Sequence, residues 1–152
     1  MSVRAAHCTV LIHGTRYGIA VDRVQEVLRP APLAPLPLAP PCVAGLLHLR
    51  GRILTALDLR RCLDLPARDA GEPSVHVVVR EDADMASLLV DAVGDVVEVS
   101  PREWVATPET LGDGVRRLVR GAWKLDHGLL LALDVSRTLA MAHTRREPSV
   151  PA

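Results

Sequence analysis

The sequence predicts an all-β protein, a barrel or sandwich of roughly nine or ten short strands. Three observations indicate this fold class. Short β-branched or apolar segments recur along the chain, turn residues separate them, and few stretches carry helical caps or helical periodicity. The length of 152 residues fits a single domain, and 49% apolar residues are enough for a core. With no Phe, two Trp and one Tyr, that core must be filled by Val, Leu, Ile and Ala.

The chain opens with a predicted hairpin. Residues 7–13 are mostly β-branched or apolar, Gly14 and Thr15 indicate a turn, and residues 17–19 suit the return strand. A short helix is then predicted over residues 22–28.

That helix is predicted from its cap and its apolar face. Asp22 can serve as the cap, and Gln25 stands three residues later. Val21, Val24 and Leu28 share one helical face. The helix must end before the proline-rich stretch that follows.

Residues 30–41 form this proline-rich stretch, with prolines at 30, 32, 35, 37, 40 and 41. Proline cannot donate to a β-ladder and favours an extended path. One interpretation is a ligand for a proline-recognition domain. We favour a stiff surface connector, because Leu33, Leu36 and Leu38 alternate with the prolines and can pack inward.

Two further strands, or one bent strand, are predicted at 43–49 and 52–57, with Gly51 allowing the bend. Asp58 can then cap a brief helical turn over residues 59–63.

The second half of the chain is again rich in strand signals. Strands are predicted at 75–79, 87–90, 96–99, 115–122 and 129–133. Asp134 or Ser136 then starts a final helix that runs to about Ala142. A polar break near residue 70 is compatible with two small barrels, and residues 143–152 are predicted to be a flexible tail.

Charge and hydropathy exclude several classes of function. Acidic and basic residues balance to a net charge of zero, which argues against nucleic-acid binding. No apolar run approaches the roughly 20 residues that cross a bilayer, and the first residues lack the apolar region of a secretory signal. We therefore expect a cytoplasmic protein without direct membrane insertion.

No metal, cofactor or catalytic site is predicted. Cys8, Cys42 and Cys62 are odd in number and far apart in sequence, and we expect them to be buried apolar residues. The six histidines lack zinc-ligand spacing, and His7 and Cys8 would point to opposite faces of a strand. Nucleophile elbows, zinc-protease motifs and glycine-rich phosphate loops are absent from the sequence. Asp58, Asp91 and Asp134 at strand ends are interpreted as turn or cap residues.

Several motifs, in order, resemble the CheW family. They are Tyr17-Gly18-Ile19, Val24-Gln25-Glu26-Val27, the segment from Val43 to Leu54 with its Leu49-Arg50-Gly51, Leu57-Asp58-Leu59, Leu89-Val90-Asp91-Ala92-Val93, Arg120-Gly121, and Leu130 to Asp134. The resemblance covers residues 7–142 as a single domain. The chain departs from it at Thr55-Ala56, where the family often has Pro-Val, and in the absence of Phe from the first strand.

The resemblance implies two intertwined five-stranded SH3-like barrels with short helices, the first mainly 15–70 and the second mainly 75–135, with strands partly exchanged. It also implies a non-enzymatic adaptor of chemosensory arrays. The implied partners are the cytoplasmic tip of a methyl-accepting chemoreceptor, the regulatory domain of a CheA-type histidine kinase, and other CheW-like domains. Carried over from the family, the partner-binding positions are Val24, Glu26 and Arg50.

The sequence is compatible with other roles for these residues and for the protein. Val24 can be a core residue, Arg50 can support the strand bend by binding a carbonyl, and Glu26 can be a solvated charge. The function can also be that of an adaptor in a motility or development pathway, a detached kinase regulatory domain, or, less favoured, a small hydrolase.

Overall fold

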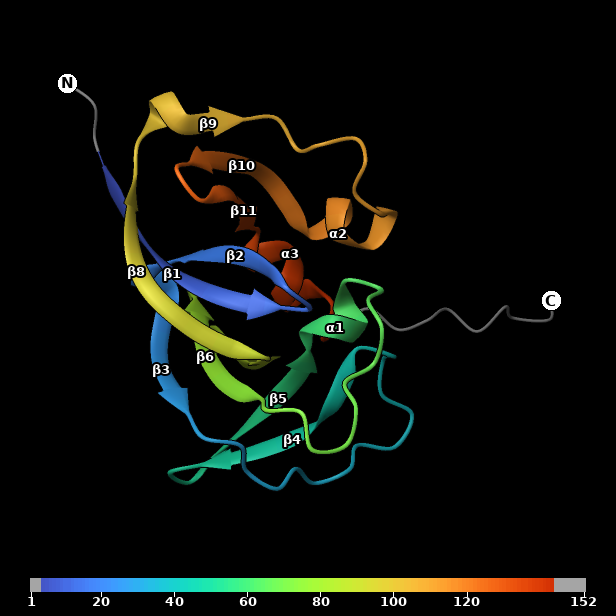
Figure 1. Cartoon of the computed structure of the whole chain (residues 1–152). Helices are drawn as coiled ribbons and strands as arrows, with labels where there is room; N and C mark the ends of the chain where they lie inside the picture. Colours follow the sequence, from blue (N-terminus) through green and yellow to red (C-terminus); the bar gives the residue numbers. More distant parts are fainter. Residues whose placement is uncertain (1–3, 144–152) are drawn as a thin grey trace, which may run out of the picture.

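The computed structural model describes residues 4–143, which form two curved β-sheets connected by short helices (Figure 1). The strands are β1 (Ala5–Ile12), β2 (Thr15–Ala20), β3 (Val24–Leu28), β4 (Val43–Leu49), β5 (Arg52–Asp58), β6 (Val75–Glu81), β7 (Asp84–Val90), β8 (Ala92–Val99), β9 (Trp104–Val105), β10 (Val119–Leu125) and β11 (Gly128–Leu133). The helices are η1 (Val21–Arg23), α1 (Leu59–Cys62), η2 (Pro101–Glu103), α2 (Asp113–Leu118) and α3 (Val135–Ala140).

The strands divide into a six-stranded and a five-stranded sheet. Sheet A has the order β8-β1-β2-β11-β10-β9, and sheet B has the order β3-β6-β7-β5-β4. The pairs β2–β11 and β5–β7 are parallel, and the others are antiparallel. The all-β fold class with short helices is confirmed, and sheet A gains its sixth strand from the two-residue β9.

The two sheets are intertwined along the chain. β1 and β2 join the late strands β8 to β11, whereas β6 and β7 join the early strands β3 to β5. The ranges 15–70 and 75–135 therefore do not separate the two sheets. β2, in the first range, belongs to sheet A, and β6 and β7, in the second range, belong to sheet B. Of the predicted tail 143–152, all but His143 lies outside the described residues.

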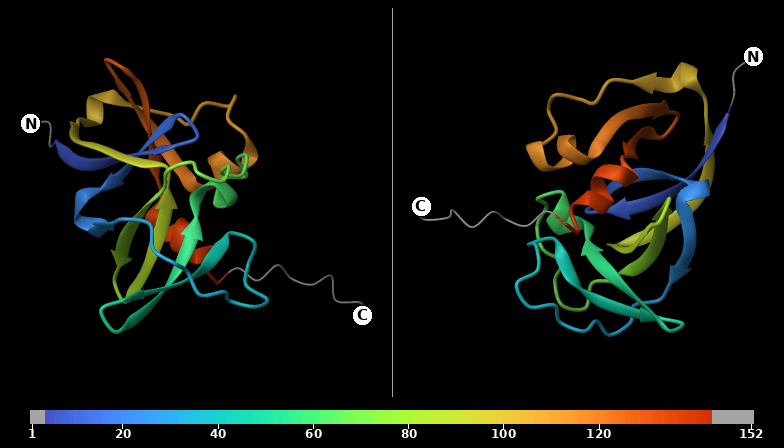
Figure 2. Two further views of the ribbon diagram at one scale, coloured as in Figure 1. Left: turned by 60° about the horizontal axis from the view of Figure 1, so that its bottom comes forward. Right: turned by 180° about the vertical axis from the view of Figure 1, so that it is seen from behind.

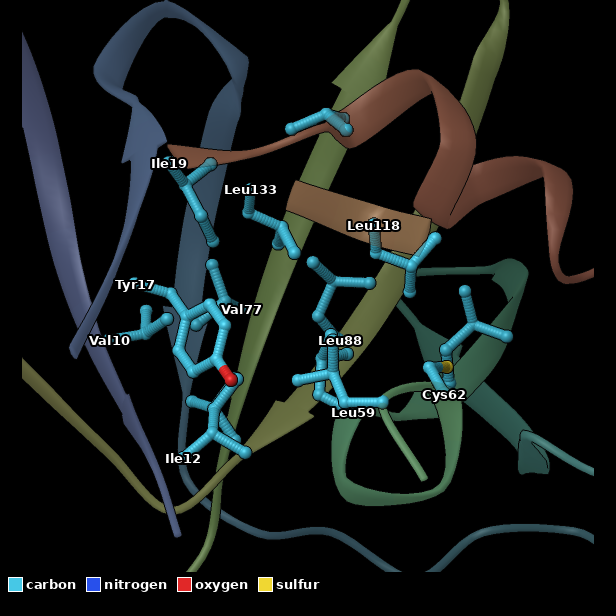
Figure 3. Close-up of a cluster of buried hydrophobic side chains, with 14 of the residues drawn as sticks. Val10, Ile12, Tyr17, Ile19, Leu59, Cys62, Val77, Leu88, Leu118 and Leu133 are labelled. Carbon is cyan, nitrogen blue, oxygen red and sulfur yellow. The ribbon is translucent and has the colours of Figure 1, made fainter. Parts of the chain in front are cut away.

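One aliphatic core lies between the sheets and takes side chains from both. Val10 and Tyr17 of sheet A, Val77 and Leu88 of sheet B, and Leu59 of α1 are all at most 1% exposed (Figure 3). Helix α3 packs against β6 and β7 and lies centrally between the sheets when the molecule is seen from behind (Figure 2). The small aromatic content is thus compensated by Val, Leu and Ile.

Sheet A is also covered on its second face. Trp123 packs with His7 at a centroid distance of 4.4 Å and with Trp104 at 5.0 Å. Cys8, the neighbour of His7, belongs instead to the main core. The expectation that His7 and Cys8 point to opposite faces is confirmed.

The predicted helix over residues 22–28 is wrong. Only Val21–Arg23 form a 3-10 turn, and the next five residues are strand β3. β3 pairs with β6, and long-range pairing of this kind overrides a weak local helix signal. The caps predicted at Asp58 and Asp134 are confirmed, since their side chains accept hydrogen bonds from the Arg60 and Arg137 amides.

The proline-rich stretch is a surface connector whose middle contacts β4. Ala34 forms a bridge with Leu46, and Leu33 packs against the sheet B cluster. The expected inward packing is wrong for Leu36 and Leu38, which are 40% and 103% exposed. Two backbone hydrogen bonds between Ala34 and Leu46 hold the connector on β4. Inward packing of Leu36 and Leu38 is therefore not needed to anchor it.

Candidate partner-binding site

The positions Glu26 and Arg50 lie on the two opposite edges of sheet B. Glu26 is in β3 and Arg50 is in the turn between β4 and β5. Arg50 has φ 49° and Gly51 has φ 79°. Two consecutive residues of positive φ are the pattern of the tight hairpin turn that matches strand twist. The turn projects Arg50 beyond the end of its strand.

An ion pair joins these two residues. Arg50 Nη1 donates to Glu26 Oε2 at 2.9 Å, and Nη2 donates to Oε1 at 2.5 Å. Such a bidentate pair fixes the plane of the guanidinium as well as its position. β3 and β4 are the two edge strands of sheet B, so the ion pair joins the two edges of this curved sheet.

The pair is accessible to a partner from one side. The Arg50 side chain is 74% exposed, whereas the Glu26 side chain is 23% exposed. An exposed ion pair contributes only about 0.2–1 kcal/mol to stability. The sequence left open that Arg50 binds a nearby carbonyl. In the structure its partner is the carboxylate of Glu26, 24 residues away.

A small opening lies beside the ion pair. A cavity of about 240 Å³ is lined by Glu26, Arg50 and the apolar side chains Leu54, Val78 and Met85. These apolar residues belong to the satellite cluster that fills sheet B. The site therefore combines a fixed charged group with an apolar floor, which is the mixture found at protein interfaces.

Val24 has a different position from the other two predicted residues. It begins β3, pairs with Val79, and packs half-buried against the main core. A register shift separates Val24 from Glu26. The structure thus brings Glu26 and Arg50 together and places Val24 in a supporting contact with the core.

A second charged cluster lies near the junction of the sheets and was not predicted. Asp91 accepts from Arg60 Nη2 at 2.7 Å, from Arg68 Nη2 at 2.7 Å and from the His13 amide at 2.8 Å. Arg60 also donates to Glu72 at 2.9 Å. Burial alone would raise the Asp91 pKa, but the hydrogen bonds from Arg60, His13 and Arg68 outweigh it and lower the pKa from 3.8 to about 2. The cluster fastens the polar loop after α1. Asp91 thus has structural partners, but it binds distant arginines and the His13 amide and is not the predicted turn or cap residue.

One buried pair has the composition of a nucleophile and a base. His76 Nδ1 lies 2.7 Å from Ser87 Oγ, with exposures of 1% and 0%. Burial lowers the pKa of His76. A catalytic serine must reach a substrate, and this one is sealed inside sheet B. The pair satisfies two buried polar groups and gives no support to the hydrolase alternative.

The described part of the chain has neither a metal-binding cluster nor a membrane-spanning helix. Residues 4–143 hold no cluster of three or more His, Cys, Asp or Glu side chains arranged to bind a metal ion. Within the same residues, no helix has both the length and the apolar character to span a membrane.

Comparisons with known proteins agree with the fold and with the motifs. The chain is 30% identical over 117 residues to the chemotaxis protein CheW of Rhizobium meliloti, covering 77% of this chain and 76% of that protein. It is 26% identical over 129 residues to the chemotaxis protein CheW of Helicobacter pylori, covering 85% and 78%.

A solved structure is also similar. The crystal structure of the scaffolding protein TtCheW from Thermoanaerobacter tengcongensis superposes with a TM-score of 0.76 at 22% identity, covering 86% of this chain and 89% of that chain. The family model described as the CheW-like domain matches residues 7–143. The chain therefore belongs to the CheW-like domain family.

Proposed function

We propose that this protein is a non-enzymatic adaptor that couples methyl-accepting chemoreceptors to a CheA-type histidine kinase in the cytoplasm. The observation that carries the proposal is the CheW-like domain match over residues 7–143. The relatives named chemotaxis protein CheW support the chemosensory setting. A CheW-like adaptor of a motility or development pathway would share this fold. Binding to a chemoreceptor tip as well as to a kinase regulatory domain would favour the chemotaxis adaptor over this alternative.

The Glu26–Arg50 pair is the proposed contact with a partner, and the chemistry of arginine supports this. A guanidinium carries five N–H donors, and two of them bind Glu26 here. The remaining donors of the 74% exposed side chain are available to carbonyl or carboxylate groups of a receptor tip or kinase regulatory domain. Val24 would act indirectly, by holding the start of β3 against the core.

The proposal predicts that Arg50→Ala and Glu26→Lys weaken binding far more than they weaken the fold. Each change should alter the unfolding free energy by no more than about 1 kcal/mol, because the pair is at the surface. Loss of an arginine anchor at an interface costs about 2 kcal/mol, which is roughly a thirtyfold loss of affinity. Titrations against the receptor tip and the kinase regulatory domain of the same organism, with thermal melts, measure both quantities.

Two further variants make this test specific. Arg102→Ala removes an exposed arginine on η2, beside sheet A, and should leave binding unchanged. The double variant Glu26→Arg with Arg50→Glu can restore an ion pair but presents reversed charges to a partner. If the double variant binds normally, the pair serves only the fold of sheet B and not recognition. Normal binding of both single variants to both partners would remove the site from the proposal altogether.

A further inference from the structure

An open cavity on the second face of sheet A gathers both tryptophans of the chain. It has a volume of about 440 Å³, and its walls include Trp104, Trp123, Val99 and Pro101. Sites for small molecules typically have roughly 300–1,000 Å³, mostly apolar walls and a few polar groups that orient the ligand. With two tryptophans and no phenylalanine in the sequence, the chain places its largest side chains around this one cavity.

Trp104 is held in place although it is partly exposed. It is 40% exposed, whereas Trp123 is 6% exposed. The two residues are paired across β9 and β10, and their rings meet edge to face at a centroid distance of 5.0 Å. A Cβ at Gly121 would clash with the Trp104 ring, so the bare glycine lets the indole lie directly against β10. An exposed aromatic surface is therefore fixed before any ligand arrives.

Arg120 gives the cavity its charge. In a regular strand, residues three apart point to opposite faces, yet both Arg120 and Trp123 line this cavity. The β10–β11 register shifts between Val119 and Gly121 and leaves Arg120 as an extra residue. Such a bulge re-aims a side chain. Arg120 is exposed, and its side chain makes no hydrogen bond or ion pair within residues 4–143.

The charge decides which class of ligand fits the aromatic walls. His7 adds a third ring, packed at 4.4 Å from Trp123, and its Nδ1 donates to the Ala5 carbonyl at 3.3 Å. Aromatic rings alone would suit an organic cation. Of the described residues that line the cavity, none is acidic, and the guanidinium of Arg120 repels a cation. A free guanidinium instead binds a carboxylate through two parallel hydrogen bonds.

We propose that this cavity binds a small aromatic carboxylate, with the ring of the ligand against Trp104 and Trp123 and its carboxylate on Arg120. This binding site goes beyond the adaptor role and does not depend on it. β9 lies at the opposite end of the molecule from β4 and β5, whose turn carries Arg50 (Figure 1). The cavity is thus separate from the Glu26–Arg50 pair.

A matched pair of probes tests the proposal on the full-length chain. Naphthalene-1-acetate should bind with a Kd of about 1 mM or lower in calorimetric titration. It should also shift both tryptophan indole N–H signals in nuclear magnetic resonance spectra. The neutral naphthalene-1-acetamide should bind about tenfold more weakly, because it lacks the charge-assisted hydrogen bonds. Equal affinity for the two probes, or unchanged indole signals, would overturn the proposal.

Variants assign the roles of the two kinds of side chain. Arg120→Gln should weaken binding of the acetate by about tenfold and leave the amide unaffected. Arg116→Gln is the control, because Arg116 is an exposed arginine of α2 that does not line the cavity. Trp104→Leu should weaken binding of both probes, and thermal melts check that each variant is folded.

Two results would contradict the assignment to a carboxylate. One is an Arg120→Gln variant that binds the acetate as tightly as the wild type. The other is a proline-rich peptide that shifts the same indole signals and binds equally well to Arg120→Gln, since aromatic grooves also recognise extended proline segments. The comparison of the two probes on the wild type decides the proposal even if Trp104→Leu does not fold, and it is independent of receptor or kinase binding.

Discussion

Asp91 is the carboxylate on which two nearly buried arginines depend. The side chains of Arg60 and Arg68 are 7% and 10% exposed, and both donate to Asp91. At the residue scale, sequence patterns predicted the local caps Asp58 and Asp134, because a cap binds an amide a few residues away. They did not reveal the pairing of Asp91 with Arg60, since 31 positions separate the two and no spacing rule connects them.

Replacing Asp91 should destabilise the fold strongly. Asp91→Asn removes the carboxylate that Arg60 and Arg68 share and leaves Arg60 with Glu72 and Arg68 with Asp58 as ionic partners. Breaking a buried pair costs about 3–5 kcal/mol. Urea denaturation at neutral pH measures the change. Asp64→Asn is the control, because the Asp64–Arg117 pair is exposed and its loss should cost within about 0.5 kcal/mol. Equal effects of the two variants would contradict the role given to Asp91.

Acid should remove the contribution of Asp91 in a defined pH range. Its folded pKa of about 2 lies below the ordinary 3.8, so the ionised group stabilises the fold above pH 3.8. This contribution, of the order of 2 kcal/mol, is lost as the pH falls from 3.8 through 2. The drop in unfolding free energy over this range should be smaller in Asp91→Asn than in the wild type. An unchanged slope would show that other carboxylates dominate.

Protonation of His76 should lower the stability of the fold at a higher pH than protonation of Asp91 does. Burial lowers its pKa below 6.5, so below this pH the unfolded chain binds a proton that the folded chain excludes. The unfolding free energy should therefore fall as the pH decreases through 6.5. Nuclear magnetic resonance titration separates His76 from His7, whose pKa burial also lowers. A His76 ring that titrates at or above 6.5 would contradict the prediction.

At the scale of elements, long-range pairing decides what local patterns leave ambiguous. Val24 and Leu28 are spaced to share one helical face, yet residues 24–28 form β3 because their backbone pairs with β6. The β1–β2 hairpin was predicted because its turn contains glycine and lies between apolar segments, whereas β4 and β5 were predicted as either two strands or one bent strand. The connector was identified from its prolines, but its point of contact at Ala34 has no signal in the sequence.

Gly45 allows the connector to contact β4 at Ala34, and a side chain added at Gly45 should break this contact. A Cβ at Gly45 would lie 2.7 Å from the Ala34 carbonyl oxygen, and its φ of +152° is one that L side chains rarely adopt. Gly45→Ala should therefore cost about 1–3 kcal/mol of unfolding free energy. Gly94→Ala is the control, because its Cβ would meet Thr9 at an ordinary 3.6 Å. Similar melting temperatures for both variants would show that the connector shifts freely.

At the scale of the whole molecule, the shared core joins the two sheets into one unit. The resemblance implied two barrels with exchanged strands, and the structure has β1 and β2 in sheet A with the late strands, and β6 and β7 in sheet B with the early ones. Strand periodicity cannot predict this exchange, because it reports which face of a strand is buried and not which strand lies next to it. Family motifs supplied the topology that periodicity lacked.

The shared core predicts that the two sheets unfold in a single transition. Both tryptophans lie in sheet A, so fluorescence reports on that sheet, whereas Leu47 is 2% exposed in a cluster confined to sheet B and its connections. Leu47→Ala should cost about 2–5 kcal/mol by leaving a cavity. If the molecule is one cooperative unit, the tryptophan transition and the far-ultraviolet dichroism transition should move to lower urea by the same amount. A tryptophan transition that stays at its wild-type midpoint while the dichroism transition splits would show that the sheets unfold separately, in spite of the side chains they share.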